Sequence, residues 1–170
     1  MQTYFELFGL EPSFDIDVSV LEQIYQTQIA KHHPDKFVAK SEKEQTLALQ
    51  NTSLINTAFD TLKSPLLRAT YLLELNDINA FDEKDTQMDM DFLMSQIELR
   101  ESLEVIEKTK DEMDLDDFIE NIGNKVAQNI DKIKQSFEIN ALSDIKNLVR
   151  ELKFYTQLKT QANQLMDELL

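Results

Sequence analysis

Glycine and proline are almost absent from the chain, and this scarcity constrains its fold more than any other feature. Only two glycines and three prolines occur among the 170 residues. Leucine, isoleucine, lysine, glutamate and glutamine are abundant, which is typical of helices. The sequence therefore predicts an all-α protein, and its length allows one domain or two small ones.

The charge of the chain excludes several kinds of partner. The formal net charge is -15, whereas nucleic acids and anionic membranes both require a concentrated basic surface. Residues 1–75 hold 10 acidic and 6 basic residues, a net charge of -4, and residues 76–170 hold 22 and 11, a net charge of -11. We expect no nucleic-acid and no membrane partner, and a second half that prefers a basic or neutral protein surface.

The chain contains no cysteine, so it can form no disulfide, thiolate nucleophile or cysteine-held metal cluster. The adjacent His32 and His33 point in different directions, and no second group of residues has ligand spacing. Catalytic pairing would need a nucleophile or orienting group that the sequence does not offer. We therefore expect no metal, no cofactor and no enzymatic activity. Without a signal-peptide pattern or a membrane-length apolar run, a cytoplasmic location is expected.

A proline separates two amphipathic helical patterns in the first half of the chain. The first pattern runs from Val18 to Ala30 and the second opens at Ser41, with Glu44 three residues later as in a capping box. Because Pro34 disfavours helical geometry at the preceding residue, the first helix is expected to end near His33. The result is a short, stiff, charged loop with His33 and the following Asp35 exposed. Such loops often carry function, although His-Pro-Asp also suits an ordinary turn.

The elements around this loop have recognisable ends. A short apolar helix is expected before Gly9, which suits a left-handed helix end. The helix from Val18 can be capped by Asp17, or by Ser19 with Glu22 three residues later; the sequence leaves both open. Ser64 can cap a further short helix that starts at Pro65 and closes the domain at Leu75.

The helix from Ser41 has an apolar stripe at helical spacing. Its members are Leu47, Leu54, Ala58 and Leu62, with Phe59 widening the stripe. We expect this stripe to pack antiparallel against Leu21, Ile24 and Ile29 of the preceding helix.

The second half begins with an acidic stretch and continues with three long helical patterns. Residues 76–88 form the predicted linker. The helices are expected at about 89–110, 115–139 and from a cap at Ser143 to the end. Short connections favour antiparallel neighbours, so residues 89–170 are predicted to form a three-helix bundle.

Several segments together resemble one family. Residues 3–10 resemble the opening helix of a J-domain, and His33-Pro34-Asp35 occupies the place of its signature loop. Residues 36–37, 55–62, 65–73 and 92–101 are similar to HscB, the J-type co-chaperone of iron–sulfur cluster assembly. The resemblance implies a J-domain over residues 1–75, a helical hairpin with short flanking helices, joined to the bundle.

The resemblance also implies a surface for an ATPase chaperone of the HscA or DnaK kind. The residues expected to bind the chaperone are Lys31, His32, His33, Pro34, Asp35 and Lys36. J-domains usually carry several basic residues on the helix before the loop. Here glutamines occupy positions expected to be exposed: Gln23, Gln26 and Gln28. We therefore expect weak electrostatic steering and a specialised partner.

A second surface is expected on the helix after the linker. At about 100° per residue, Phe92, Leu99, Leu103 and Ile106 share one narrow arc, which is an adequate bundle seam. Other apolar and acidic residues fall in a different arc. They are either further core contacts or, as the resemblance implies, the face that binds the IscU-type scaffold protein. The expected scaffold-binding residues are Leu93, Met94, Ile97, Glu98, Glu101 and, from the last helix, Phe154.

Phe154 lies one residue off the seam of the last helix, which fits an exposed position. The sequence also carries Val105 where the family may have an acid. The predicted function is a co-chaperone that stimulates a chaperone's ATPase and delivers the scaffold to it. The alternative is a helical adaptor whose acidic bundle binds another protein, without ATPase stimulation.

Overall fold

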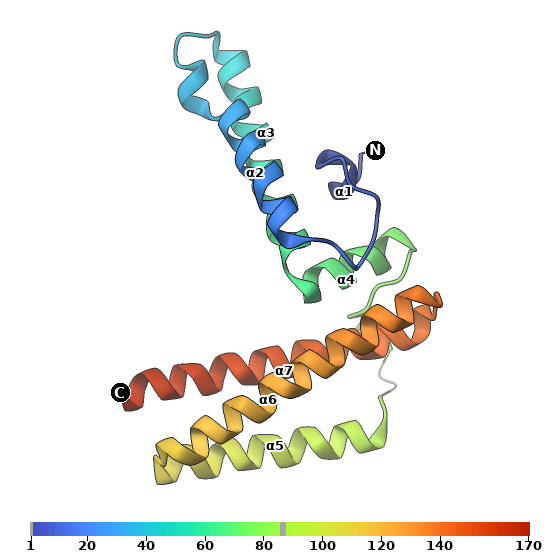
Figure 1. Ribbon diagram of the computed structural model, residues 1–170, viewed down its shortest axis with the longest axis vertical. Coiled ribbons are helices and arrows are strands. Elements are labelled where there is room, and N and C mark those ends of the chain that lie inside the picture. Colours follow the sequence, from blue (N-terminus) through green and yellow to red (C-terminus); the bar gives the residue numbers. More distant parts are fainter. Residues whose placement is uncertain (1, 86–87) are drawn as a thin grey trace. The chain divides into compact units, whose positions relative to one another are not determined.

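The computed structural model describes residues 2–85 and 88–170, and all regular structure among them is helical. The chain divides into two compact units, Met1–Leu75 and Asn76–Leu170. The prediction of an all-α fold is confirmed. Figure 1 shows the helices in chain order.

The first unit is a helical hairpin with shorter helices beside it. Its elements are α1 (Tyr4–Leu7), α2 (Val18–His32), the 3₁₀ helix η1 (Pro34–Phe37), α3 (Glu42–Lys63) and α4 (Pro65–Leu75). The helices α2 and α3 lie side by side and are joined at one end by the segment that contains η1 (Figure 1).

Caps define the helix ends as the sequence indicated. Asp17, rather than Ser19, caps α2, since its carboxylate accepts from the backbone N–H groups of Ser19 and Val20. The Ser41 hydroxyl accepts from Glu44 at the start of α3. Gly9 has a φ of 67°, the left-handed geometry expected after α1.

The apolar stripe predicted for α3 is displaced by one residue in two places. Leu47 and Leu54 are 55% and 45% exposed, whereas their neighbours Ala48 and Ile55 are buried. On a helix the two sets differ by about 100°, so the buried arc of this part of α3 is turned by that angle from the predicted one. Ala58 and Leu62 are fully buried, as predicted.

A buried arginine joins three segments of the first unit. Arg68 on α4 is 6% exposed. Its Nε donates to the carbonyl of Phe14 at 2.8 Å, and its Nη1 donates to the carbonyl of Leu62 at 2.6 Å. The guanidinium also lies over the Phe14 ring, 4.8 Å from its centre. Burial lowers the pKa of Arg68 and the charge of Asp15 raises it, but a guanidinium remains protonated in proteins.

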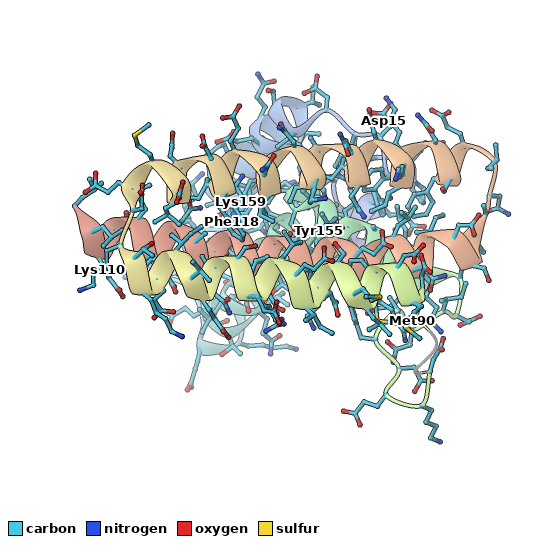
Figure 2. The ribbon with its side chains drawn as sticks, turned by 90° about the horizontal axis from the view of Figure 1, so that it is seen from below. Asp15, Met90, Lys110, Phe118, Tyr155 and Lys159 are labelled. Atoms are coloured by element: carbon cyan, nitrogen blue, oxygen red, sulfur yellow. The ribbon has the colours of Figure 1, made fainter. Side chains whose placement is uncertain are left out.

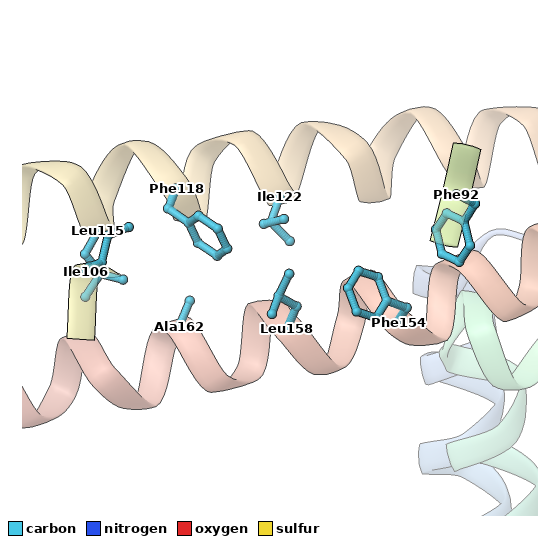
Figure 3. Close-up of a cluster of buried hydrophobic side chains, with 8 residues drawn as sticks. All are labelled: Phe92, Ile106, Leu115, Phe118, Ile122, Phe154, Leu158 and Ala162. Atoms are coloured by element: carbon cyan, nitrogen blue, oxygen red, sulfur yellow. The ribbon is translucent and has the colours of Figure 1, made fainter. Parts of the chain in front are cut away.

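The second unit is a three-helix bundle, formed by α5 (Met90–Thr109), α6 (Glu112–Glu138) and α7 (Leu142–Leu169). Side chains from all three helices meet in one core cluster (Figure 3). The helices α6 and α7 share the most extensive contact. The cluster consists of Phe92, Ile106, Leu115, Phe118, Ile122, Phe154, Leu158 and Ala162.

Two helix starts differ from the sequence prediction. Asp111 caps α6 by accepting from the N–H groups of Met113 and Asp114, so this helix begins before Leu115. Ser143 does not cap α7, because Ala141 is the residue at that position and makes no side-chain cap. Ser143 lies two residues after Ala141, inside the first turn of α7, and not at the N-cap position from which a hydroxyl reaches the free N–H groups.

Part of the predicted acidic linker packs on the bundle. Ala80 is fully buried, and Arg150 of α7 donates to the carbonyls of Ala80 and Asp85 at 2.7 and 2.8 Å. Lys146 pairs with the carboxylate of Asp85. Residues 86–87 of the predicted linker lie outside the described residues. The carboxylate of Asp85 and backbone carbonyls of this stretch are therefore partners of the cations of α7.

A polar pair interrupts the apolar contact between α6 and α7. Asn129 is 4% exposed, and its Nδ2 donates to Oε2 of Glu151 at 3.3 Å, while its buried Oδ1 has no partner among the described residues. Burial raises the pKa of Glu151; Lys132 lowers it and Asp89 raises it further. The polar pair makes the stability of this interface sensitive to pH.

Replacing Arg68 should destabilise the first unit strongly. In Arg68→Met the carbonyls of Phe14 and Leu62 lose their donors in a buried place, which should cost roughly 2–5 kcal/mol of unfolding free energy. Urea unfolding followed by circular dichroism measures this loss. Lys63→Met is the control: its lysine is half-exposed, pairs with Asp60 and lies 5.1 Å from the centre of the Phe59 ring, so a loss below about 1 kcal/mol is expected. Equal losses in both variants would contradict the role of Arg68.

Glu151 should make the bundle less stable as the pH rises. Its folded pKa lies above its ordinary value of 4.5, so the folded state binds the proton more tightly. The associated stability is present below the ordinary pKa and is lost as the pH rises through the raised folded value. Unfolding free energies of wild type and Glu151→Gln should therefore diverge in favour of the variant from about pH 4.5 towards neutrality. A pH-independent difference would refute this.

Candidate functional site: an exposed loop and the outer face of a helix

The signature loop begins where α2 is forced to end. His33 has φ -59° and ψ 134°, an extended conformation that the following Pro34 favours. Pro34 then opens η1, because its fixed φ suits a first helical position and its missing N–H leaves no donor unpaired. The predicted end of α2 near His33 is confirmed, and the loop proves to be a single 3₁₀ turn.

The side chains of His33 and Asp35 are both exposed at this turn. Their side chains are 48% and 87% exposed. Nδ1 of His33 accepts from the backbone N–H of Asp35 at 3.2 Å and lies 3.5 Å from Oδ2 of the same residue. In the neutral ring Nδ1 serves as the cap of η1, whereas a proton at Nδ1 would face the carboxylate. The two residues thus form one local unit that points to solvent.

The other predicted chaperone-binding residues surround this unit. Lys31 and Lys36 are exposed, whereas His32 and Pro34 are half-buried. On α2, Gln23 and Gln26 are exposed, as predicted.

Gln28 was predicted to be exposed, and this prediction is wrong. It is half-buried, because its Nε2 donates to the carbonyl of Leu7 at 2.7 Å and thereby ties α2 to the end of α1.

The seam predicted for α5 is confirmed. Phe92 and Ile106 are 6% and 7% exposed, and Leu99 and Leu103 are partly buried against the core cluster. Phe92 meets the ring of Phe154 edge-on at a centroid distance of 5.8 Å. One face of α5 is therefore committed to the bundle.

A second face of α5 is apolar and open to solvent. We call it the outer face, and it comprises Met90, Leu93, Met94, Ile97, Glu98, Glu101 and Val105. Met94, Ile97 and Val105 are 56%, 58% and 59% exposed. Leu93 is half-buried, and both glutamates are exposed. The alternative that Met94 and Ile97 are core residues is thereby excluded.

Met90 belongs to the outer face and was missed from the sequence. It is 67% exposed and starts α5, whose other end is marked by Lys110 (Figure 2). Its angular position, at about 100° per residue, falls between those of Ile97 and Glu101. Extending the angular analysis to the first residue of the helix would have found it.

Phe154 was expected to be exposed, and this expectation is wrong. It is 6% exposed and lies in the core cluster, opposite Phe92 (Figure 3). Because α7 contacts both α5 and α6, its buried arc is wider than a single seam. The guanidinium of Arg100 lies over the Phe154 ring, 5.2 Å from its centre.

Phe154 nevertheless borders a surface hollow of about 480 Å³ in the second unit. Gln96 and Arg100, both of α5, line it as well. Their positions on α5 adjoin that of Leu93, so the hollow continues the outer face. The remaining lining residues are Phe81, Asp82, Asp85, Met88, Arg150, Lys153 and Gln157.

Neither surface has the composition of a metal site. Over residues 2–85 and 88–170, no group of three or more His, Cys, Asp or Glu side chains is placed to hold a metal ion. Within the same ranges no helix is long and apolar enough to cross a membrane. Both surfaces are instead suited to contact proteins, with an exposed charged loop on one and apolar side chains edged by acid on the other.

Comparison with known proteins agrees with both units. Residues 88–163 match the family model described as the HSCB C-terminal oligomerisation domain. The structure of chaperone HscB from Vibrio cholerae is 34% identical, covers 99% of this chain and 100% of its own, and superposes with a TM-score of 0.89. The human co-chaperone protein HscB is 26% identical over 96% of this chain and 82% of its own, with a TM-score of 0.90. The yeast Jac1 co-chaperone shares the fold, at 24% identity over 96% and 94% of the two chains, with a TM-score of 0.75.

Proposed function

Because the chain belongs to the HscB family of J-type co-chaperones of iron–sulfur cluster assembly, we propose that it stimulates an HscA/DnaK-type ATPase and delivers an IscU-type scaffold protein to it. The observation that carries this proposal is the presence of two exposed surfaces in one chain. The signature loop presents His33 and Asp35, and the outer face of α5 presents Met94 and Ile97.

The loop is proposed to engage the chaperone. Lys31, His32, His33, Pro34, Asp35 and Lys36 would form the contact. Their support comes from the exposure of His33 and Asp35 and from the stiff turn that Pro34 starts. Because Gln23 and Gln26 occupy the exposed side of α2, recognition depends more on the loop than on long-range attraction.

The outer face is proposed to bind the scaffold. Leu93, Met94 and Ile97 are the apolar anchors, and Glu98 and Glu101 form a charged rim, as is usual in transient interfaces. Met90 extends the apolar area. Phe154 contributes to this binding surface by lining the adjoining hollow, and not as an exposed anchor.

The mechanism that follows is tethering. One chain that holds the scaffold on its second unit and the chaperone on its first converts their meeting into an intramolecular event. The effective concentration of a tethered partner is on the order of millimolar for short flexible connections. The chain contributes binding and orientation, while ATP hydrolysis occurs on the chaperone.

Replacing either His33 or Asp35 should abolish stimulation of the chaperone. We expect His33→Gln or Asp35→Asn to remove the stimulated ATP hydrolysis in a steady-state assay with a purified HscA-type chaperone. Both side chains are exposed, so unfolding free energy should change by no more than about 0.5 kcal/mol. Asp60→Asn is the matched control, since it neutralises an exposed aspartate of α3 with a side-chain exposure of 65%. Full stimulation by either loop variant would contradict the assignment.

Truncating the outer face should remove scaffold binding without unfolding the bundle. The triple variant Leu93→Ala, Met94→Ala and Ile97→Ala should lose binding to a purified IscU-type scaffold in calorimetry. Because Met94 and Ile97 are more than half exposed, the melting temperature should fall far less than for core truncations of about 2–5 kcal/mol each. A large fall in melting temperature, or unchanged scaffold binding, would sink this proposal.

The control for this experiment removes apolar surface elsewhere in the same unit. Met113 and Ile139 are 79% and 77% exposed and lie outside α5, so their double alanine variant should bind the scaffold normally. Phe154→Ala is unsuitable as an added test. Its burial predicts a loss of about 3–5 kcal/mol, which would mix unfolding with lost contact.

A further inference from the structure

The signature loop receives hydrogen bonds from α3 at both of its ends. At the entry, the Thr52 hydroxyl lies 3.0 Å from the carbonyl oxygen of His32, the last residue of α2. At the exit, Nε2 of Gln45 donates to the carbonyls of Val38 and Lys40 at 3.0 and 3.2 Å. Both donors are side chains of one helix that runs beside the loop.

The other hydrogen bonds described for the loop are local, among them that from the N–H of Asp35 to Nδ1 of His33. No residue of η1 is buried, so apolar packing contributes little there. Its described backbone bonds are short-range, from Lys36 to the carbonyl of His33 and from Lys40 to that of Phe37, each at 3.0 Å. The last carbonyls of α2 also lack helical partners, as at any helix end. The side chains of α3 supply donors where the backbone has none.

We propose that Thr52 and Gln45 are positioning residues for the signature loop, and that they set the orientation in which His33 and Asp35 meet the chaperone. The inference rests on the proposed function, because it concerns the same contact. Thr52 anchors the carbonyl directly before His33, and Gln45 anchors the chain directly after η1. Together they limit the movement of the turn that lies between them.

Thr52 differs in one measurable respect from Thr46 and Thr61, two further threonines of α3. Thr46 and Thr61 donate to the carbonyls of Glu42 and Thr57, four residues earlier, at 3.0 and 2.9 Å. Thr52 has the same bond, to Ala48 at 2.9 Å, and in addition reaches His32. Its single proton is shared between the two carbonyls. Replacing Thr46 or Thr52 by valine therefore removes the same helical bond, but only the second change frees the loop.

The experiment measures stimulated ATP hydrolysis of a purified HscA-type chaperone as a function of co-chaperone concentration. For Thr52→Val and Gln45→Met, we expect maximal stimulation to fall roughly tenfold, because a misplacement of about 1 Å can cost on the order of 100-fold in rate. The half-saturating concentration should change less, since Lys31, His33 and Asp35 are retained. Amide hydrogen exchange at Lys36 and Lys40 should become faster.

Three controls separate positioning from general stability. Thr46→Val and Gln50→Met alter matched side chains of α3 and should stimulate like wild type. Thr52→Ser keeps the hydroxyl and should restore stimulation. Scaffold binding should be unchanged in all variants, because it is proposed to use the second unit.

The outcomes distinguish this inference from the function on which it rests. If the wild type itself fails to stimulate the chaperone, the proposed function fails. If the wild type stimulates while Thr52→Val and Gln45→Met match it, the function holds and the positioning role is refuted. Equal losses in Thr46→Val and Thr52→Val would also overturn it, since the effect would then belong to the helical bond. Gln45 is exposed, so its variant remains informative even if Thr52→Val unfolds.

Discussion

The guanidinium of Arg68 bonds to carbonyls from two segments that are far apart in sequence, those of Phe14 and Leu62. One carbonyl lies in the connection before α2 and the other in the last turn of α3. A charged group is costly to bury unless its donors are used, so the two segments and α4 must come together around it. These bonds fix the end of the α2–α3 hairpin that lies next to α4. The signature loop lies at the opposite end of the hairpin (Figure 1).

Away from this base, the hairpin is held by further contacts between its two helices. Tyr25 stacks on Phe59 at a centroid distance of 4.0 Å, and its hydroxyl donates to Oδ1 of Asn56 at 2.6 Å. The side chains of Thr52 and Gln45 donate further hydrogen bonds from α3 to backbone carbonyls at the two ends of the loop. A local change in α3 therefore bears on the loop without touching its signature residues.

The two proposed surfaces would bind their partners through different interactions. The loop presents polar groups whose solvation remains largely intact, and their orientation comes from backbone geometry and hydrogen bonds. The outer face of α5 presents methylene and methyl groups whose removal from water drives association. Its glutamates stay at the edge, where charge is tolerated.

Much of this protein follows from the sequence alone. The scarcity of glycine and proline determined an all-helical chain, and Pro34 determined where α2 ends. The caps at Ser41 and Ser64 act within one turn, so local sequence was sufficient to predict them, whereas the choice of Asp17 over Ser19 at the start of α2 came from the structure. The angular separation of two apolar arcs on α5 also indicated that one of them faces away from the seam.

Only the tertiary structure decided which arcs become core. Leu47 and Leu54 are exposed although they keep helical spacing, and Phe154 is buried although it lies off the seam. Gln28 and Arg150 donate hydrogen bonds to backbone carbonyls of segments that are distant in sequence. Asp85, in the acidic stretch after α4, pairs with Lys146 of α7. Helical periodicity specifies angles on one helix, whereas burial depends on how many neighbours that helix has and on which sides they lie.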